Sequence, residues 1–162
     1  MEKSTLSVLI VDDYEPFRQF IATKLQTDPK LRIIKEACDG ADAVQQAQEL
    51  QPDLILLDIG LPTLNGMEAA RRIRKVSPTS KILFVTENRS TDIAEEALST
   101  GAGGYVVKSD AASELLPAIK AVLQGKRFVS ASLAGHFLVA TTVSTTQTTL
   151  LTSMVTLISG IR

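Results

Sequence analysis

The sequence predicts an α/β fold built on a doubly wound parallel sheet, and three observations support that prediction. Short apolar runs rich in Val, Ile and Leu alternate with segments of helical periodicity along most of the chain. The runs are almost continuously apolar, which is typical of strands buried on both faces of a sheet. Four of them end on polar residues, namely Asp12-Asp13, Asp58, Thr86 and Lys108. Strands that alternate with helices in this way predict right-handed βαβ units.

The first half of the chain predicts three strands and two helices. We expect strands at 6–11, 31–37 and 53–58, and helices at 15–27 and 41–50. Pro16 suits a first helical turn, where a missing N–H group costs nothing. Pro29 ends that helix, because the residue before a proline avoids the α region. The strand at 31–37 is more polar than the others, so we expect it at an edge of the sheet.

The second half predicts two strands and three helices. We expect strands at 82–85 and 104–107, and helices at 66–76, 91–100 and 110–124. Ser90 is a suitable N-cap for the middle helix, and Gly101 is a suitable left-handed residue after it. Pro117 interrupts the last pattern, so either the helix bends there or it begins near Ser113. The five βα units predict a five-stranded, flavodoxin-like sheet with strand order 2-1-3-4-5.

Composition limits the classes of function. The 162 residues carry a formal net charge of -1 with a pI near 5.8, which gives no general electrostatic reason to bind nucleic acid or an anionic membrane. Cys38 is the single cysteine, so an internal disulfide is excluded, and we expect its side chain to be buried at a strand end. The first residues lack the regions of a secretory signal. We therefore expect a cytoplasmic protein.

The polar residues at the strand ends predict one small site. Carboxyl ends of parallel strands share one edge of a sheet, and ligands bind in the crevice there. Three carboxylates, a hydroxyl and an ammonium would meet at that edge: Asp12, Asp13, Asp58, Thr86 and Lys108. Carboxylates at close range repel one another, and a divalent cation relieves the repulsion. Oxygen ligands without a nearby His or Cys favour Mg²⁺.

These residues also resemble a known family. Each alone has an ordinary explanation as a cap, a turn residue or a solvated lysine. In order and spacing, however, the set resembles the receiver domain of bacterial response regulators: Asp12, Asp13, Asp58, Thr86, Tyr105 and Lys108. The segment 58–66, with Pro62 and Asn65-Gly66, resembles the loop that follows the phosphoacceptor. The resemblance implies a receiver domain at 1–127 and a C-terminal segment at 128–162.

The resemblance implies a two-component response regulator in which Asp58 accepts a phosphoryl group from a sensor histidine kinase. Mg²⁺ would be held by Asp12, Asp13, Asp58 and the backbone carbonyl of Ile59. Lys108 would pair with Asp58 and later with the phosphoryl group. Thr86 and Tyr105 would switch the face formed by the fourth helix, fifth strand and fifth helix. Such a domain is not an enzyme in the usual sense; it controls a partner or dimerises when phosphorylated.

The C-terminal segment predicts no recognisable effector domain. Residues 125–130 resemble the end of the receiver in NarL/FixJ-type regulators, which continue into a helix-turn-helix module that binds DNA. Here we expect a short helix at 131–140 and a Thr-rich tail. Because residues 138–161 carry no charge to neutralise phosphates, we expect no DNA binding by this chain. Thr, Ser and Gln recur through that stretch, so we expect no membrane span either.

Two alternatives remain open, and one of them arises from a departure from the family pattern. Glu87 follows Thr86 where the family often has a small residue, which places a carboxylate near the site. A pseudo-receiver that binds its partners without phosphate is therefore one alternative. A phosphatase of the haloacid-dehalogenase type is another, since it also uses an aspartate nucleophile with Mg²⁺. That chemistry needs a second aspartate two residues further on, where this chain has Gly60.

Overall fold

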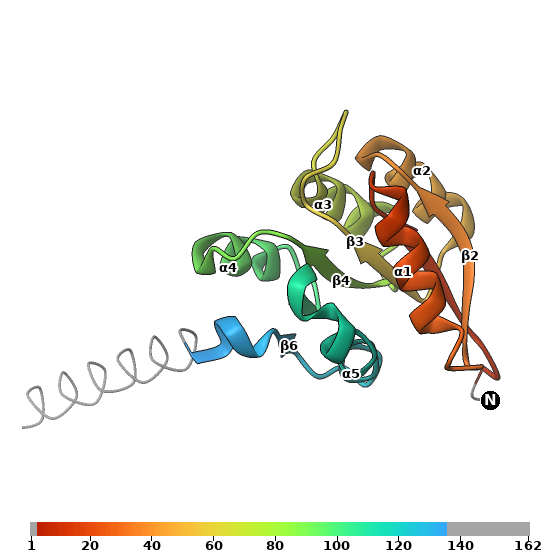
Figure 1. Ribbon diagram of the computed structural model, residues 1–162. Helices are drawn as coiled ribbons and strands as arrows, with labels where there is room; N and C mark the ends of the chain where they lie inside the picture. The colour runs from red at the N-terminus through yellow and green to blue at the C-terminus, as the bar shows by residue number, and fades with distance from the viewer. Residues whose placement is uncertain (1–2, 136–162) are drawn as a thin grey trace, which may run out of the picture. The chain divides into compact units, whose positions relative to one another are not determined.

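The computed structural model describes residues 3–135 and contains a parallel sheet with strand order β2-β1-β3-β4-β5-β6 (Figure 1). The strands are β1 (Leu6–Val11), β2 (Leu31–Ala37), β3 (Leu54–Leu57), β4 (Lys81–Thr86), β5 (Gly104–Val107) and β6 (Phe128–Val129). β3 lies in the sheet between β1 and β4 and is buried along its whole length, which explains its uninterrupted apolar run. The predicted order of the first five strands is confirmed, with the polar β2 at an edge.

Helices cover both faces of the sheet. They are α1 (Glu15–Leu25), α2 (Gly40–Leu50), α3 (Gly66–Val76), α4 (Thr91–Ser99) and α5 (Ala111–Leu123), with a 3₁₀ turn, η1, at Lys108–Asp110. α1 and α5 lie on the face turned to the viewer in Figure 1, where Ile21 and Leu115 share one core with Ile10. Alternate strand residues such as Leu9 and Ile55 point to the other face, under α2, α3 and α4. Burying one such side chain stabilises the fold by ~2 kcal/mol.

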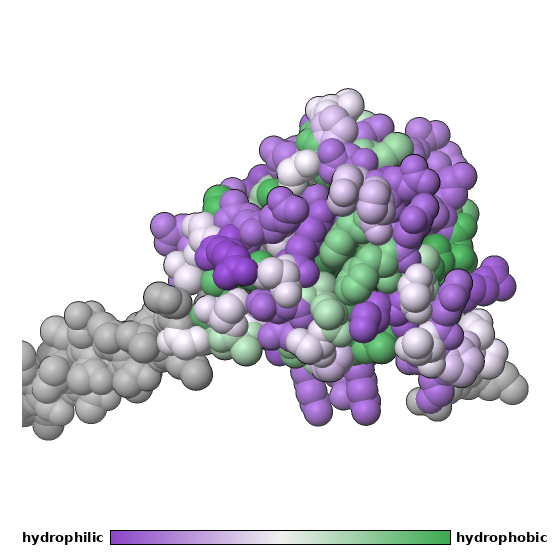
Figure 2. Space-filling model, viewed as in Figure 1, coloured by the Kyte–Doolittle hydropathy of each residue, from purple (hydrophilic) through white to green (hydrophobic). Residues whose placement is uncertain are grey.

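The core on the α1 and α5 side reaches the surface. Phe17, Phe20 and Leu116 are only partly buried and pack against this core. The two phenylalanine rings stack on each other, with their centroids 5.4 Å apart. Figure 2 shows hydrophobic residues gathered on this face of the molecule within a mostly hydrophilic surface. The first turns of α1 are therefore held by aromatic packing beside the carboxyl edge of the sheet.

Local signals set most helix ends. Asp39, Asn65 and Ser90 cap α2, α3 and α4, and each side chain accepts the N–H of the third residue on, at 2.8, 3.0 and 3.4 Å. Gly101 has a φ of 94° and is therefore the left-handed residue that follows α4, as predicted. α5 begins at Ala111 and contains Pro117. A start near Ser113, one of the two possibilities raised for this helix, is therefore wrong.

Two other predictions are also wrong. The sheet has a sixth strand, because Phe128 and Val129 pair with Gly104 and Tyr105 of β5, so the sheet extends beyond residue 127. A two-residue strand is too short to show periodicity in the sequence. Cys38 is exposed rather than buried. It follows the end of β2, an edge strand with a neighbour on one side only, so little packs over it.

The chain divides into two units, residues 1–130 and 131–162. In the second unit, residues 131–135 are helical, as expected for the start of the short helix predicted at 131–140. The rest of that helix and the Thr-rich stretch at 138–161 lie outside the described residues. Between residues 3 and 135, no helix is long and apolar enough to cross a membrane.

Candidate functional site

The carboxyl ends of β1, β3, β4 and β5 meet at one edge of the sheet. The register places Val11 beside Leu57 and Leu57 beside Phe84, so the residues that follow these strands become neighbours. The Asp58 N–H donates to the Val11 carbonyl at 3.0 Å, which positions the start of the loop after β3. This edge holds the five residues that the strand ends predicted: Asp12, Asp13, Asp58, Thr86 and Lys108.

Three carboxylates form a cluster at this edge. One oxygen each of Asp12, Asp13 and Asp58 lies within 4.8 Å of the others, and only Asp13 is exposed. Burial raises the pKa of the Asp12 carboxyl, although hydrogen bonds from Lys108 and the Tyr14 N–H act in the opposite direction. Hard oxygen donors that are partly buried and repel one another fit a divalent cation such as Mg²⁺.

Lys108 lies between two of these carboxylates. Its Nζ is 2.7 Å from Asp12 Oδ2 and 3.2 Å from Asp58 Oδ2, and 11% of its side chain is exposed. The Phe17 ring packs against the ammonium, with its centroid 4.5 Å from Nζ. Burial alone would lower the pKa of Lys108, but the hydrogen bond to Asp12 and the charge of Asp58 raise it above its ordinary value. The lysine is therefore charged, and it contacts Asp12 as well as the expected Asp58.

Arg18 of α1 holds the backbone of Asp12, beside the ion pair that Asp12 forms with Lys108. Its guanidinium donates to the Asp12 carbonyl at 2.8 Å and pairs with Glu36 of β2 at 3.3 Å. The Tyr14 N–H donates to Asp12 Oδ1 at 2.9 Å. Sequence reasoning missed Arg18, because its role depends on β2 lying next to β1 and on one helical face turning toward both. Together these contacts orient Asp12 and leave its second oxygen, Oδ2, to the Lys108 ammonium.

The Ile59 carbonyl is arranged differently from what a cation ligand requires. Its oxygen accepts the N–H groups of Leu61 and Gly66, at 2.9 and 2.8 Å, so both of its lone pairs are used within the loop. Close packing produces this arrangement. A Cβ at Gly66 would lie 1.9 Å from the Asp58 carbonyl oxygen, so only glycine lets α3 begin so near the end of β3.

Thr86 and Tyr105 are linked by hydrogen bonds to the main chain of Asn88, in the loop that leads to α4. Tyr105 is fully buried. Burial, and to a smaller extent the charge of Asp58, raises its pKa to about 12, so the hydroxyl keeps its proton. That hydroxyl donates to the Asn88 carbonyl at 2.8 Å, while the Asn88 N–H donates to Thr86 Oγ1 at 3.4 Å. Sequence reasoning also missed Asn88, which takes part through its backbone and so carries no side-chain signal.

A cavity of about 550 Å³ opens over these groups. Carboxylates, a glycine, a hydroxyl and an ammonium line it: Asp13, Asp58, Gly60, Thr86, Glu87 and Lys108. Asp12, which is 1% exposed, does not line it. The cavity therefore gives an anionic group access to Asp58 and Lys108 together.

Comparison with known proteins agrees with this geometry. The sequence matches the family described as the response regulator receiver domain over residues 8–120. The chain belongs to this family. The receiver domain superimposes on a two-component response regulator of the LuxR family from Aurantimonas sp. SI85-9A1 with a TM-score of 0.78. The two sequences are 34% identical, and the match covers 82% of this chain and 94% of that one.

Longer relatives share the same domain. The receiver domain is 31% identical to the transcriptional regulatory protein DegU of Brevibacillus brevis and 32% identical to the response regulator GacA of Pseudomonas aeruginosa, each over 129 residues and 80% of this chain. These matches cover 55% and 60% of those proteins, so the chain spans little more than half of their length. Receiver domains bind Mg²⁺ at an acidic pocket, and the aspartate cluster lies where such a pocket is expected.

Proposed function

We propose that this receiver domain accepts a phosphoryl group on Asp58 from a sensor histidine kinase, in a Mg²⁺-dependent reaction. One observation supports Asp58 over its neighbours: it both lines the cavity and contacts Lys108. Asp13 lines the cavity, but no cation of the described residues pairs with it. Asp12 pairs with Lys108 but does not line the cavity.

The surrounding groups suit transfer of a phosphoryl group to a carboxylate. An Asp58 oxygen would form a bond to phosphorus while the bond from phosphorus to the donor histidine nitrogen breaks. Bound Mg²⁺ would supply charge that offsets the repulsion between the two anionic reactants. Lys108 would contact one phosphoryl oxygen with its ammonium, and Thr86 would donate its hydroxyl to another. The domain thus assists its own phosphorylation but has no separate substrate.

The three clustered aspartates are the proposed metal ligands. Asp13 and Asp58 would bind Mg²⁺ directly, and Asp12 would bind it directly or through water. Because the Ile59 carbonyl accepts two N–H groups, we assign the backbone ligand to Gly60 instead. Gly60 lines the cavity, and no donor among the described residues occupies its carbonyl. This set consists of oxygen atoms only, as Mg²⁺ prefers.

The link through Asn88 would carry the change at Asp58 to the protein surface. If the Thr86 hydroxyl turns to a phosphoryl oxygen, the Asn88 N–H loses its acceptor, while the Asn88 carbonyl keeps its hydrogen bond from Tyr105. A dianionic group would in this way bias the face formed by α4, β5 and α5. We propose that this face controls a protein partner or a homodimer in the cytoplasm, and that the chain itself does not bind DNA.

Intact mass spectrometry tests this function. The full chain is incubated with Mg²⁺ and phosphoramidate, beside Asp58→Asn and beside a sample with a chelator in place of Mg²⁺. We expect the native chain alone to gain the mass of one phosphoryl group, because only it has both the acceptor and the metal. If the folded native chain gains no mass from this donor or from acetyl phosphate, the phosphate-independent pseudo-receiver becomes the better description.

A further inference from the structure

Glu87 is the fourth carboxylate of the site and, unlike the other three, lies outside the cluster of proposed metal ligands. It follows β4 directly, is exposed, and lines the cavity over Asp58. No ion pair joins it to any residue between 3 and 135, whereas Asp12 and Asp58 share Lys108. Its charge is therefore not held in an ion pair, and it acts on whatever enters the cavity.

The charges around the cavity show what Glu87 changes. The four carboxylates Asp12, Asp13, Asp58 and Glu87, with the one ammonium of Lys108, leave three negative charges. A divalent cation would reduce these to one. The same site without the Glu87 carboxylate would be neutral once it held the cation. Glu87 thus decides whether the metal-loaded cavity repels an incoming anion.

We propose that Glu87 is a specificity-determining residue: it strengthens Mg²⁺ binding and selects against free, doubly charged phosphodonors. The proposal rests on the function proposed above. A small donor must enter the cavity against the Glu87 charge, whereas a protein donor gains binding energy from contacts outside it. Since Glu87 is exposed, solvent and salt screen its charge, and we expect effects of about three- to tenfold.

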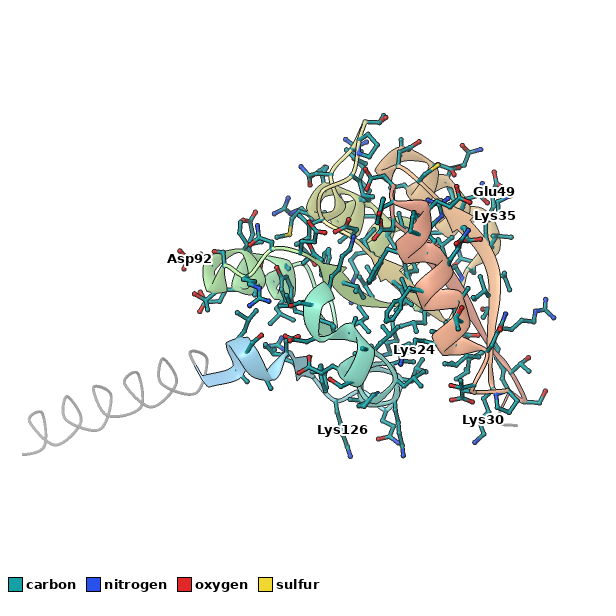
Figure 3. The ribbon with its side chains drawn as sticks, in the orientation of Figure 1. Lys24, Lys30, Lys35, Glu49, Asp92 and Lys126 are labelled. Atoms are coloured by element: carbon teal, nitrogen blue, oxygen red, sulfur yellow. The ribbon has the colours of Figure 1, made fainter. Side chains whose placement is uncertain are left out.

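Two variants separate charge from size, and a third provides the control. Glu87→Gln removes the charge and keeps the size of the side chain, and Glu87→Ala removes both. Asp92→Asn removes an exposed carboxylate near the start of α4 that does not line the cavity and that points outward in Figure 3. All three substitutions lie at exposed positions, so the fold should be unchanged.

The first measurement is Mg²⁺ affinity by isothermal titration calorimetry, with no phosphodonor present. We expect the dissociation constant to rise about threefold or more in Glu87→Gln and Glu87→Ala and to stay unchanged in Asp92→Asn. The reason is that Glu87 lines the same cavity as the proposed metal ligands and Asp92 does not. An unchanged dissociation constant in both Glu87 variants would overturn this half of the proposal.

The second measurement is the rate of phosphorylation at saturating Mg²⁺ with two donors of different charge. Acetyl phosphate is a dianion near neutral pH and loses acetate as Asp58 bonds to phosphorus. Phosphoramidate is mainly a monoanion and loses ammonia. We expect Glu87→Gln to accelerate the reaction with acetyl phosphate about three- to tenfold and with phosphoramidate by less. The difference should shrink as salt is added, because salt screens the Glu87 charge.

The outcomes distinguish the proposals. If Glu87→Ala accelerates both donors equally while Glu87→Gln has no effect, side-chain size is responsible and the charge proposal is overturned. Equal rates in all variants overturn it as well. If the native chain is not phosphorylated at all, the proposed function fails, while the calorimetry still reports whether Glu87 strengthens Mg²⁺ binding.

Discussion

Two aspartates at opposite ends of the strands, one at the amino edge of the sheet and one at the carboxyl edge, are held in contrasting ways. Asp53, just before β3, accepts the Ser7 N–H at 2.8 Å, the Ser7 hydroxyl at 3.0 Å and the Lys3 ammonium at 2.9 Å. Its burial would raise its pKa, but these bonds hold the pKa below the ordinary value. Asp12, at the carboxyl edge, is more deeply buried beside other carboxylates, and its pKa is raised.

The opposite pKa shifts distinguish a carboxylate that stabilises the fold, Asp53, from one that belongs to the candidate site, Asp12. A carboxylate whose pKa is lowered on folding stabilises the folded state in its ionised form, and one whose pKa is raised destabilises it. Asp53 therefore helps to hold the strands, while Asp12 lowers the stability of the metal-free domain. Sites that must bind an ion often retain such unfavourable charge, since the ion relieves it.

The tight loop at the carboxyl edge gives the largest expected effect. In Gly66→Ala the new Cβ would lie 1.9 Å from the Asp58 carbonyl oxygen and 2.7 Å from the Ile59 Cα, so backbone must shift. We expect the free energy of unfolding to fall by about 3 kcal/mol or more. Urea denaturation of the variant measures this fall.

Gly60→Ala is the matched control for that loop. A Cβ at Gly60 meets nothing within 4 Å, although it lies only two residues after Asp58. We expect a change within about 0.5 kcal/mol. Equal losses in the two glycine variants would show that the loop responds to any added side chain, and that close approach to Asp58 is not the cause.

Neutralising one aspartate at each edge should change stability in opposite directions. Asp53→Asn loses the ion pair with Lys3 and weakens the bonds from Ser7, so we expect a loss of about 1–2 kcal/mol. Asp12→Asn loses the ion pair with Lys108, but the lysine keeps Asp58 as its partner and the new amide can still accept the Tyr14 N–H. The substitution also removes a buried charge that burial destabilises. We expect it to raise the stability of the metal-free domain by about 1 kcal/mol.

Adding Mg²⁺ separates these two variants further. A ligand that binds only the folded state stabilises it, so we expect Mg²⁺ to raise the thermal midpoint of Asp53→Asn but to have little effect on Asp12→Asn. Phosphorylation of Asp58 should be retained in Asp53→Asn. A metal-free Asp12→Asn domain that is less stable than the native chain would contradict the division between the two edges.

The same comparison predicts how stability depends on pH. The pKa of Asp53 in the folded state lies below 3.8, so its contribution is present above pH 3.8 and is lost as the pH falls through the lowered pKa. The pKa of Asp12 lies above 3.8, so the folded state gains stability as the pH falls from the raised pKa toward 3.8.

Urea denaturation of the metal-free domain between pH 7 and pH 3 checks these signs. The excess stability of Asp12→Asn over the native chain should decrease as the pH is lowered toward 3.8. The deficit of Asp53→Asn should decrease only at lower pH. Parallel profiles for the native chain and Asp12→Asn would mean that Asp12 titrates normally in the folded state.

Sequence reasoning succeeded where one residue pattern decides the structure. Continuous apolar runs predict buried parallel strands, and right-handed crossovers bring their carboxyl ends together. The shared position of Asp58 and Lys108 follows from that topology, although they are 50 residues apart. Ser90 caps the start of α4 and Gly101 follows its end, both as predicted, because capping depends on residues within one turn.

It failed where main-chain groups that carry no side-chain pattern decide the structure. β6 forms because Phe128 and Val129 find the free edge of β5, which no local pattern indicates. The Ile59 carbonyl turns toward the N–H groups of Leu61 and Gly66, and this depends on how tightly α3 begins. Asn88 likewise joins Tyr105 to Thr86 with main-chain atoms.

The smallest expected effect distinguishes an exposed ion pair from a buried one. The Lys3 side chain is 67% exposed, while that of Lys108 is 11% exposed. In Lys3→Gln the Asp53 carboxylate keeps both bonds from Ser7, and water solvates its remaining lone pairs, so we expect the free energy of unfolding to fall by about 0.3 kcal/mol.

Lys30→Gln is the control in urea denaturation. Lys30 is an exposed lysine (Figure 3) for which no ion pair occurs among residues 3–135. A loss above about 1 kcal/mol in Lys3→Gln alone would mean that the ion pair, rather than Ser7, holds Asp53. The amino edge would then depend on a charge pair, as the carboxyl edge does with Lys108.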